Sequence, residues 1–146
     1  MYEGAFARIG FWNAGDTTAK PNIIRGNHMD GIVVQRLSEA RIVGNTIENN
    51  GGNGILVQLN SNVQASSNTI NGNIGDGIAV VQGSGAQLGN DTGTGLFGSP
   101  NQTTIPNGGF GVSCLVGGYV DGVRGTLSGS RRRAERIAQG CFDSLR

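Results

Sequence analysis

Two aspartates are the residues of this sequence whose type and spacing most favour catalysis. Asp30 and Asp76 each precede a glycine, and Asn53 stands midway between them, 23 residues from each. If the segments that carry them stack like neighbouring β-strands, the backbones of the two aspartates lie about 9–10 Å apart. Inverting glycosidases hold their two carboxyl groups roughly 6.5–9.5 Å apart. This pair is therefore the candidate catalytic site, and its substrate would be a polysaccharide.

The same residues also have a structural interpretation, which we favour. Asp or Asn before glycine is typical of turns, because both residue types tolerate turn backbone. The only histidine, His28, takes a position held by Gly51 and Ile74 in the other segments, so we expect no Ser/His/Asp triad. Cys114 and Cys141 are the only cysteines, and they lack the ligand spacing of a zinc site. No metal or cofactor is predicted.

The segments that carry these residues form a repeat of 23 residues. Three stretches, which begin at Pro21, Gly44 and Ser67, align without a gap and share the pattern N-x-I-x-x-N-x-x-(D/N)-G-I-x-V. Two of its columns are asparagines, whose side-chain amides can both donate and accept hydrogen bonds between stacked repeats. These columns are Asn22, Asn45 and Asn68, and Asn27, Asn50 and Asn73.

The apolar residues of each repeat predict β-strands. Ile55 and Val57 flank one outward position, and this period of two is that of a strand with one buried side. Glycine and asparagine interrupt every helical candidate in the repeat. One repeat cannot bury its own apolar face, so the repeats must stack as coils of a solenoid. The period places Ile9 in register with Ile32, and regular coils are expected from about residue 8 to about residue 91.

With this pattern the sequence resembles the right-handed parallel β-helix family. The resemblance rests on the repeat at residues 44–57 and its two copies, and it covers residues 20–91. It implies an all-β, single-stranded right-handed parallel β-helix of about five coils. The family includes polysaccharide lyases, hydrolases and epimerases, and also phage tailspikes and non-catalytic surface proteins. The resemblance therefore implies a fold but leaves the function open.

The register breaks after Leu88 and returns in the stretch FGVSCLV at residues 110–116. We therefore expect a β-helix over residues 1–129 with an insertion at about 90–107. Loops on a rigid scaffold often carry function, although a tolerated surface insertion is the simpler interpretation.

Residues 130–146 predict a C-terminal capping helix that covers the open end of the stack. Ser130 is a suitable N-cap, and five residues form one helical stripe. The stripe consists of Ala134, Ile137, Ala138, Cys141 and Leu145. For Cys114 and Cys141 two alternatives stay open, a disulfide that ties this cap to the coils or two buried thiols.

The residues between the inward positions predict an apolar outer face. Val33, Leu56 and Ala79 share one outward column, with Gln35 and Gln58 beside them. Exposed apolar patches mark interfaces, and this face lacks the aromatic residues that stack on sugars. We therefore predict a homo-oligomer, formed through this face or through the open N-terminal end. We also expect the chain to be a fragment of a longer protein.

Composition and charge exclude several partners. The net charge is +1, with 11 Lys and Arg against 10 Asp and Glu, so the bulk charge does not indicate a nucleic-acid partner. No apolar run approaches the roughly 20 residues of a membrane span. Residues 1–20 do not read as a signal peptide, so the compartment stays unassigned. It would be extracellular or at the cell surface if the chain is a fragment of a secreted protein. Arg25 and Glu48 share a column and predict an ordinary cross-coil ion pair.

These observations favour a non-catalytic structural or binding module that self-associates or forms part of a larger surface-associated protein. The alternative is a carbohydrate-active enzyme or its inactive remnant. An enzyme needs a groove lined by several exposed charged residues, whereas the repeated columns of this sequence are mostly neutral.

Overall fold

In the computed structural model the chain forms fourteen β-strands, which pair in three parallel sheets. The structure describes residues 4–10, 21–89, 99–130, 135–137 and 141–145. None of these residues lies in an α-helix, and hence none lies in a helix long and apolar enough to cross a membrane.

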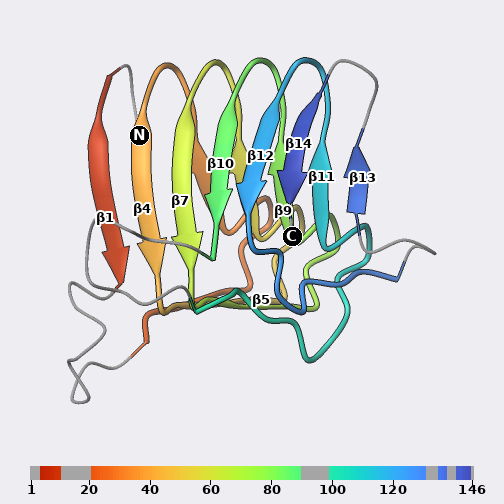
Figure 1. Cartoon of the computed structure of the whole chain (residues 1–146). Helices are drawn as coiled ribbons and strands as arrows, with labels where there is room; N and C mark the ends of the chain where they lie inside the picture. The colour runs from red at the N-terminus through yellow and green to blue at the C-terminus, as the bar shows by residue number, and fades with distance from the viewer. Residues whose placement is uncertain (1–3, 11–20, 90–98, 131–134, 138–140, 146) are drawn as a thin grey trace.

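Each sheet takes its strands from successive coils. Sheet A has the order β1 (Phe6–Gly10), β4 (Glu39–Val43), β7 (Asn62–Ser66), β10 (Gly85–Leu88), β12 (Tyr119–Gly122) and β14 (Phe142–Leu145). Sheet B has the order β2 (Ile23–Arg25), β5 (Thr46–Glu48) and β8 (Thr69–Asn71). Sheet C has the order β3 (Ile32–Val34), β6 (Ile55–Val57), β9 (Ile78–Val80), β11 (Val112–Cys114) and β13 (Glu135–Ile137). In Figure 1 the sheet A strands stand side by side in chain order from β1 to β14.

Each full coil passes once through sheets B, C and A, and the next coil stacks on it in parallel. The register follows the repeat, since Ile32 pairs with Ile55 and Ile55 with Ile78. The fold is therefore a parallel β-helix, as the repeat predicts. Its single-stranded, all-β architecture is confirmed.

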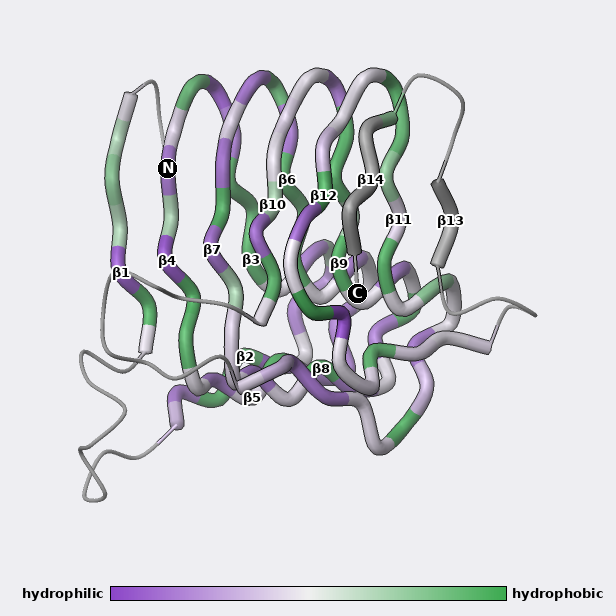
Figure 2. Tube along the Cα trace, viewed as in Figure 1, coloured by the Kyte–Doolittle hydropathy of each residue, from purple (hydrophilic) through white to green (hydrophobic). Residues whose placement is uncertain are grey.

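The core consists of aliphatic stacks that run along the axis of the solenoid. Ile47 and Ile70 from sheet B, Ile55 and Ile78 from sheet C, and Ile42 from sheet A are all fully buried. Alternating side chains of each strand point inward, and Figure 2 shows hydrophobic segments alternating with polar ones around each coil. Full burial of such a side chain stabilises the fold by about 1.5–3 kcal/mol.

The turn between sheets C and A has an unusual backbone in four successive coils. Each turn has two consecutive residues with positive φ, between 54° and 69°. The pairs are Arg36–Leu37, Leu59–Asn60, Gln82–Gly83 and Val116–Gly117. For residues other than glycine this left-handed conformation costs roughly 1–2 kcal/mol, so the parallel pairing on both sides of the turn must hold it in place.

The predicted capping helix is wrong. Within residues 130–146, β13 pairs in parallel with β11, and β14 pairs in parallel with β12. Ser130 is no helix N-cap, since its backbone N–H donates to the Asn107 carbonyl at 2.7 Å. A further coil satisfies the backbone groups on the open edges of β11 and β12, which a helix would leave unpaired. Ala134 and Ala138 of the predicted stripe lie outside the described residues.

Two expectations of register also change. Ile9 pairs with Ile42 of sheet A instead of lying in register with Ile32. The predicted insertion at 90–107 is too wide, because Asn101 and Asn107 bond to Asn68 and Asn73 as members of the next coil. The separations there are 33 and 34 residues instead of 23, so the extra residues fall mostly before Ser99. Both differences arise because one coil absorbs added residues at a corner without changing its strands.

A disulfide joins Cys114 of β11 to Cys141, with the two Cα atoms 6.1 Å apart. Cys114 is fully buried in the core, and Cys141 packs against the same core. Of the two alternatives, the structure thus has the disulfide, which ties the last coil to the one before it.

Candidate functional site

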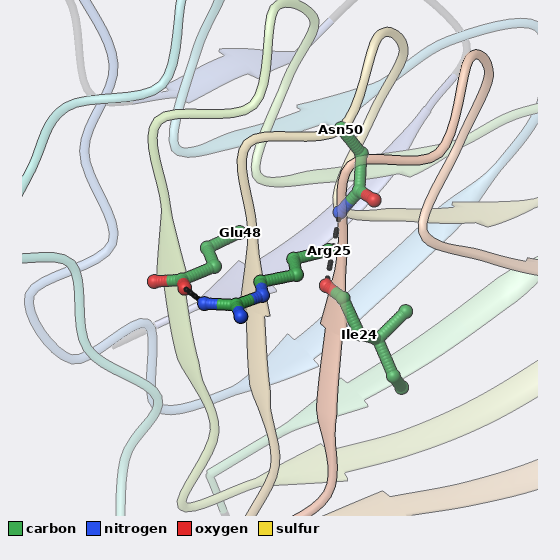
Figure 3. A network of polar contacts seen from close by, with 4 residues as sticks. All are labelled: Ile24, Arg25, Glu48 and Asn50. Atoms are coloured by element: carbon green, nitrogen blue, oxygen red, sulfur yellow. Dashed lines mark hydrogen bonds and ion pairs between the residues drawn. The ribbon is translucent and has the colours of Figure 1, made fainter.

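The two asparagine columns form hydrogen-bonded ladders inside the corners. Asn50 Oδ1 accepts from both the backbone N–H and the side-chain amide of Asn27, at 3.1 and 2.9 Å. Asn50 Nδ2 in turn donates to Asn73 Oδ1 at 2.8 Å and to the Ile24 carbonyl at 3.3 Å. Figure 3 shows Asn50 reaching the Ile24 carbonyl of the preceding coil. The predicted asparagine ladder is confirmed.

The other column repeats this arrangement. Asn22 donates to Asn45 at 2.9 Å, Asn45 to Asn68 at 3.1 Å, and Asn68 to Asn101 at 2.9 Å. Asn45 and Asn68 are buried, so water cannot replace these partners. The ladder residues are thus structural, and a ligand could reach them only by opening the fold.

The Asp30–Asn53–Asp76 column is a third ladder. Asp30 Oδ1 accepts from the backbone and the side-chain amide of Asn53, at 2.7 and 2.8 Å. Asp76 accepts from the Phe110 N–H at 2.7 Å and from the Ser113 hydroxyl at 2.5 Å. Both carboxylates are therefore engaged across coils, which supports the structural interpretation over the catalytic one.

The predicted outer face of sheet C is only partly open. Val33 and Leu56 are half-buried, while Ala79 is buried with 5% of its surface exposed. Gln58 donates to Gln35 at 2.8 Å, so these two amides form a ladder on the outside of the coil. The structure places the five predicted residues together, as expected, but with little exposed apolar surface.

The predicted ion pair between Arg25 and Glu48 is present on sheet B (Figure 3). Its closest N–O distance is 3.9 Å, and Arg25 is largely exposed. An exposed pair of this kind contributes roughly 0–1 kcal/mol. His28 is an exposed corner residue, as its irregular position in the repeat predicts.

A groove lies on the outer face of sheet A, which sequence reasoning did not single out. It encloses about 320 Å³ and crosses the strands from β1 to β12. Its outward-facing lining consists of Phe6, Glu39, Arg41, Asn62, Gln64, Gly85, Gln87, Tyr119 and Asp121. None of these strand positions keeps one residue type along the sheet, so the groove is the part of the coil surface that departs from the repeat.

Two aromatic rings bound the groove. Phe6 on β1 is 61% exposed and Tyr119 on β12 is 39% exposed. Four strand intervals of about 4.8 Å separate them, or roughly 19 Å. Tyr119 leans over Gly85, since a Cβ placed on Gly85 would lie 3.7 Å from Tyr119 Cδ1 and 2.6 Å from Asn62 Oδ1. Glycine at position 85 thus leaves room for both side chains.

Amides and charged groups lie between the rings. Gln64 Nε2 donates to Gln87 Oε1 at 3.3 Å across neighbouring strands. Arg8 pairs with Arg41 in the sheet register, and its Cζ lies 5.7 Å from the centre of the Phe6 ring. Burial, and then the positive charge of Arg8, lower the pKa of Arg41 from its usual value.

The groove has the elements of a binding surface for a hydroxyl-rich chain. Its amides can both donate and accept hydrogen bonds, and its rings offer apolar faces. Its carboxylates, Glu39 and Asp121, stand three strand intervals apart, or about 14 Å. That exceeds the roughly 6.5–9.5 Å that an inverting glycosidase needs. Across the described residues no three His, Cys, Asp or Glu side chains gather as a metal site.

Comparison with known protein families agrees with the fold. Residues 3–93, more than half of the chain, match the family of right-handed β-helix regions. The chain therefore belongs to the right-handed β-helix family, and the resemblance drawn from its repeat is confirmed. Neither the comparison with curated proteins nor the one with solved structures gives a match.

Proposed function

We propose that the chain is a non-catalytic binding module that holds an oligosaccharide on the outer face of sheet A. The observation that carries the proposal is a contrast in polar side chains. Those that repeat are bonded to one another across coils, whereas those that line the groove vary from strand to strand. The length of the groove, roughly 19 Å from ring to ring, suits a linear ligand that crosses several strands.

The alternative, an enzyme acting on polysaccharide, has less support. Asp30 and Asp76 accept hydrogen bonds from the next coil, and the groove carboxylates are too far apart to attack and protonate one bond in an inverting glycosidase. Binding without turnover is what this arrangement supports.

Isothermal titration calorimetry with oligosaccharides selected on a glycan array tests the proposal. Tyr119→Ala and Gln87→Ala should each weaken binding several-fold, because each removes a group that faces the groove. Gln58→Ala on sheet C is the matched control and should bind normally. Loss of binding in Gln58→Ala, but in neither groove variant, would overturn the proposal. Release of shortened oligosaccharides on incubation would favour the enzyme.

Self-association is a second candidate, supported by the partly exposed Val33 and Leu56 on sheet C. The N-terminal end is a further route, since β1, β2 and β3 are the outermost described strands of their sheets. Leu56→Lys should reduce the mass measured by light scattering if the face of sheet C joins two copies. An unchanged oligomer would exclude that face, and an unchanged monomer would exclude both routes.

A further inference from the structure

The ligand of sheet A, if the proposed function holds, has an acidic character that the groove itself indicates. We infer that the ligand carries an oxyanion, a carboxylate or sulfate group, which Arg8 and Arg41 receive at the β1–β4 end of the groove. The rest of the ligand then extends over the amides toward Tyr119, so the groove binds its ligand in one direction.

The first observation is the register of the two arginines. Arg8 and Arg41 are paired residues of adjacent parallel strands, so their backbones lie about 4.8 Å apart and their side chains leave the same face. Two like charges directly opposite each other are unfavourable. An oxyanion between them would offset this repulsion, and guanidinium groups bind such groups with two parallel hydrogen bonds.

The second observation is that both guanidinium groups are held in place. Arg41 has only 8% of its surface exposed although it belongs to an outward row. Arg8 lies over the ring of Phe6, an arrangement that favours arginine because its flat cation stacks on aromatic faces. Side chains that are already ordered lose less entropy when a ligand binds.

The third observation is the distribution of charge along the groove. One row of the sheet has Arg8 and Arg41, then the neutral Gln64 and Gln87, and finally Asp121. The row is therefore positive at one end and negative at the other. Asp121 lies about 14 Å from Arg41 by the strand spacing, beyond the Debye length of about 8–10 Å in physiological salt.

Glu39 is the one carboxylate near the arginines. It lies two residues before Arg41 on β4, in the row of Phe6 and Asn62. Its negative charge opposes binding of an oxyanion at the arginine pair. Removal of this charge should therefore strengthen binding of an acidic ligand and leave binding of a neutral one nearly unchanged, which a purely structural role of Glu39 does not predict.

The test compares three tetrasaccharides by calorimetry at low and physiological salt: neutral maltotetraose, carboxylated hyaluronan tetrasaccharide and a sulfated heparin tetrasaccharide. At least one acidic probe should bind tenfold or more tightly than the neutral probe. Whichever acidic probe binds more tightly identifies the oxyanion. Arg8→Gln should remove most of this preference, and Glu39→Gln should increase it. Arg25→Gln removes the same charge from sheet B and should leave the preference intact.

The outcomes separate the inference from the proposed function. Equal binding of neutral and acidic probes, or an acidic preference unchanged in Arg8→Gln, overturns the inference alone. A preference that falls equally in Arg8→Gln and Arg25→Gln also overturns it, since net charge would then explain the effect. Absence of binding by all three probes and by the array overturns both. Arg8 is largely exposed, so its substitution should leave the fold intact, and thermal unfolding checks this.

Discussion

The corners of the coils and the outer face of sheet A use the same residue types for different purposes. At the corners, asparagine amides bond to identical residues of the next coil and leave no hydrogen-bonding capacity for a ligand. On sheet A, amides such as Asn62 and Gln64 are exposed and lie among charged and aromatic neighbours. Repetition along this solenoid therefore marks residues that stabilise the stack, and departure from repetition marks the candidate binding surface.

The largest expected effect tests the structural half of this comparison. Asn50→Ala removes an acceptor for Asn27 and a donor to Asn73 and Ile24. A buried polar group that is left without a partner costs about 1–3 kcal/mol, so the free energy of unfolding in urea should fall by about 3–5 kcal/mol. Asn62→Ala, at an exposed amide, should change it by less than about 0.5 kcal/mol. Similar losses in the two variants would remove the distinction.

The next effect concerns the end of the stack, where the ladders stop and a disulfide takes over. Asn107 donates to the Ser128 carbonyl instead of to another asparagine, and Cys114 and Cys141 are joined. Closing a loop of 27 residues should stabilise the fold by about 3–4 kcal/mol in the chain-entropy account. Cys141→Ser should therefore lower the free energy of unfolding by up to that amount. An equal stability of the variant and the parent under non-reducing conditions would show that the bridge contributes nothing.

A smaller effect tests the strained turns between sheets C and A. Val116 is β-branched, exposed and held at φ 54°, beside Gly117 at φ 68°. Glycine adopts this backbone without a Cβ clash, so Val116→Gly should raise the free energy of unfolding by about 1 kcal/mol. Leu115→Gly, next to it but absent from the positive-φ pair, should lower stability instead. A loss in both variants would mean that the turn is not strained.

Much of the fold could be predicted from the sequence, because a gap-free repeat fixes both the strand register and the ladders. The C-terminal coil was missed although the signal was present. Val112 pairs with Glu135 and Tyr119 with Phe142, and both separations equal the 23-residue period. The apolar stripe of residues 134–145 fits a helix as well, and periodicity alone could not decide between the two.

The candidate site could not be predicted in the same way. Its lining comes from outward positions that keep no common residue type, so no column reveals it. Phe6 was also out of reach, because added residues between β1 and β2 shift its register from 23 to 33 residues. The insertion corners therefore hid the coil that carries Phe6 and Arg8 from a search at a fixed period.

The most direct test of the account is a chemical-shift experiment on the side-chain amides of asparagine and glutamine. Titration with the acidic tetrasaccharide that binds most tightly should shift the amide signals of Asn62, Gln64 and Gln87 and leave those of Asn50 and Asn73 in place. This result would locate the ligand on sheet A and confirm the ladders as structure. Shifts confined to Asn53 and to the ladder asparagines, with Gln64 and Gln87 unchanged, would contradict the account.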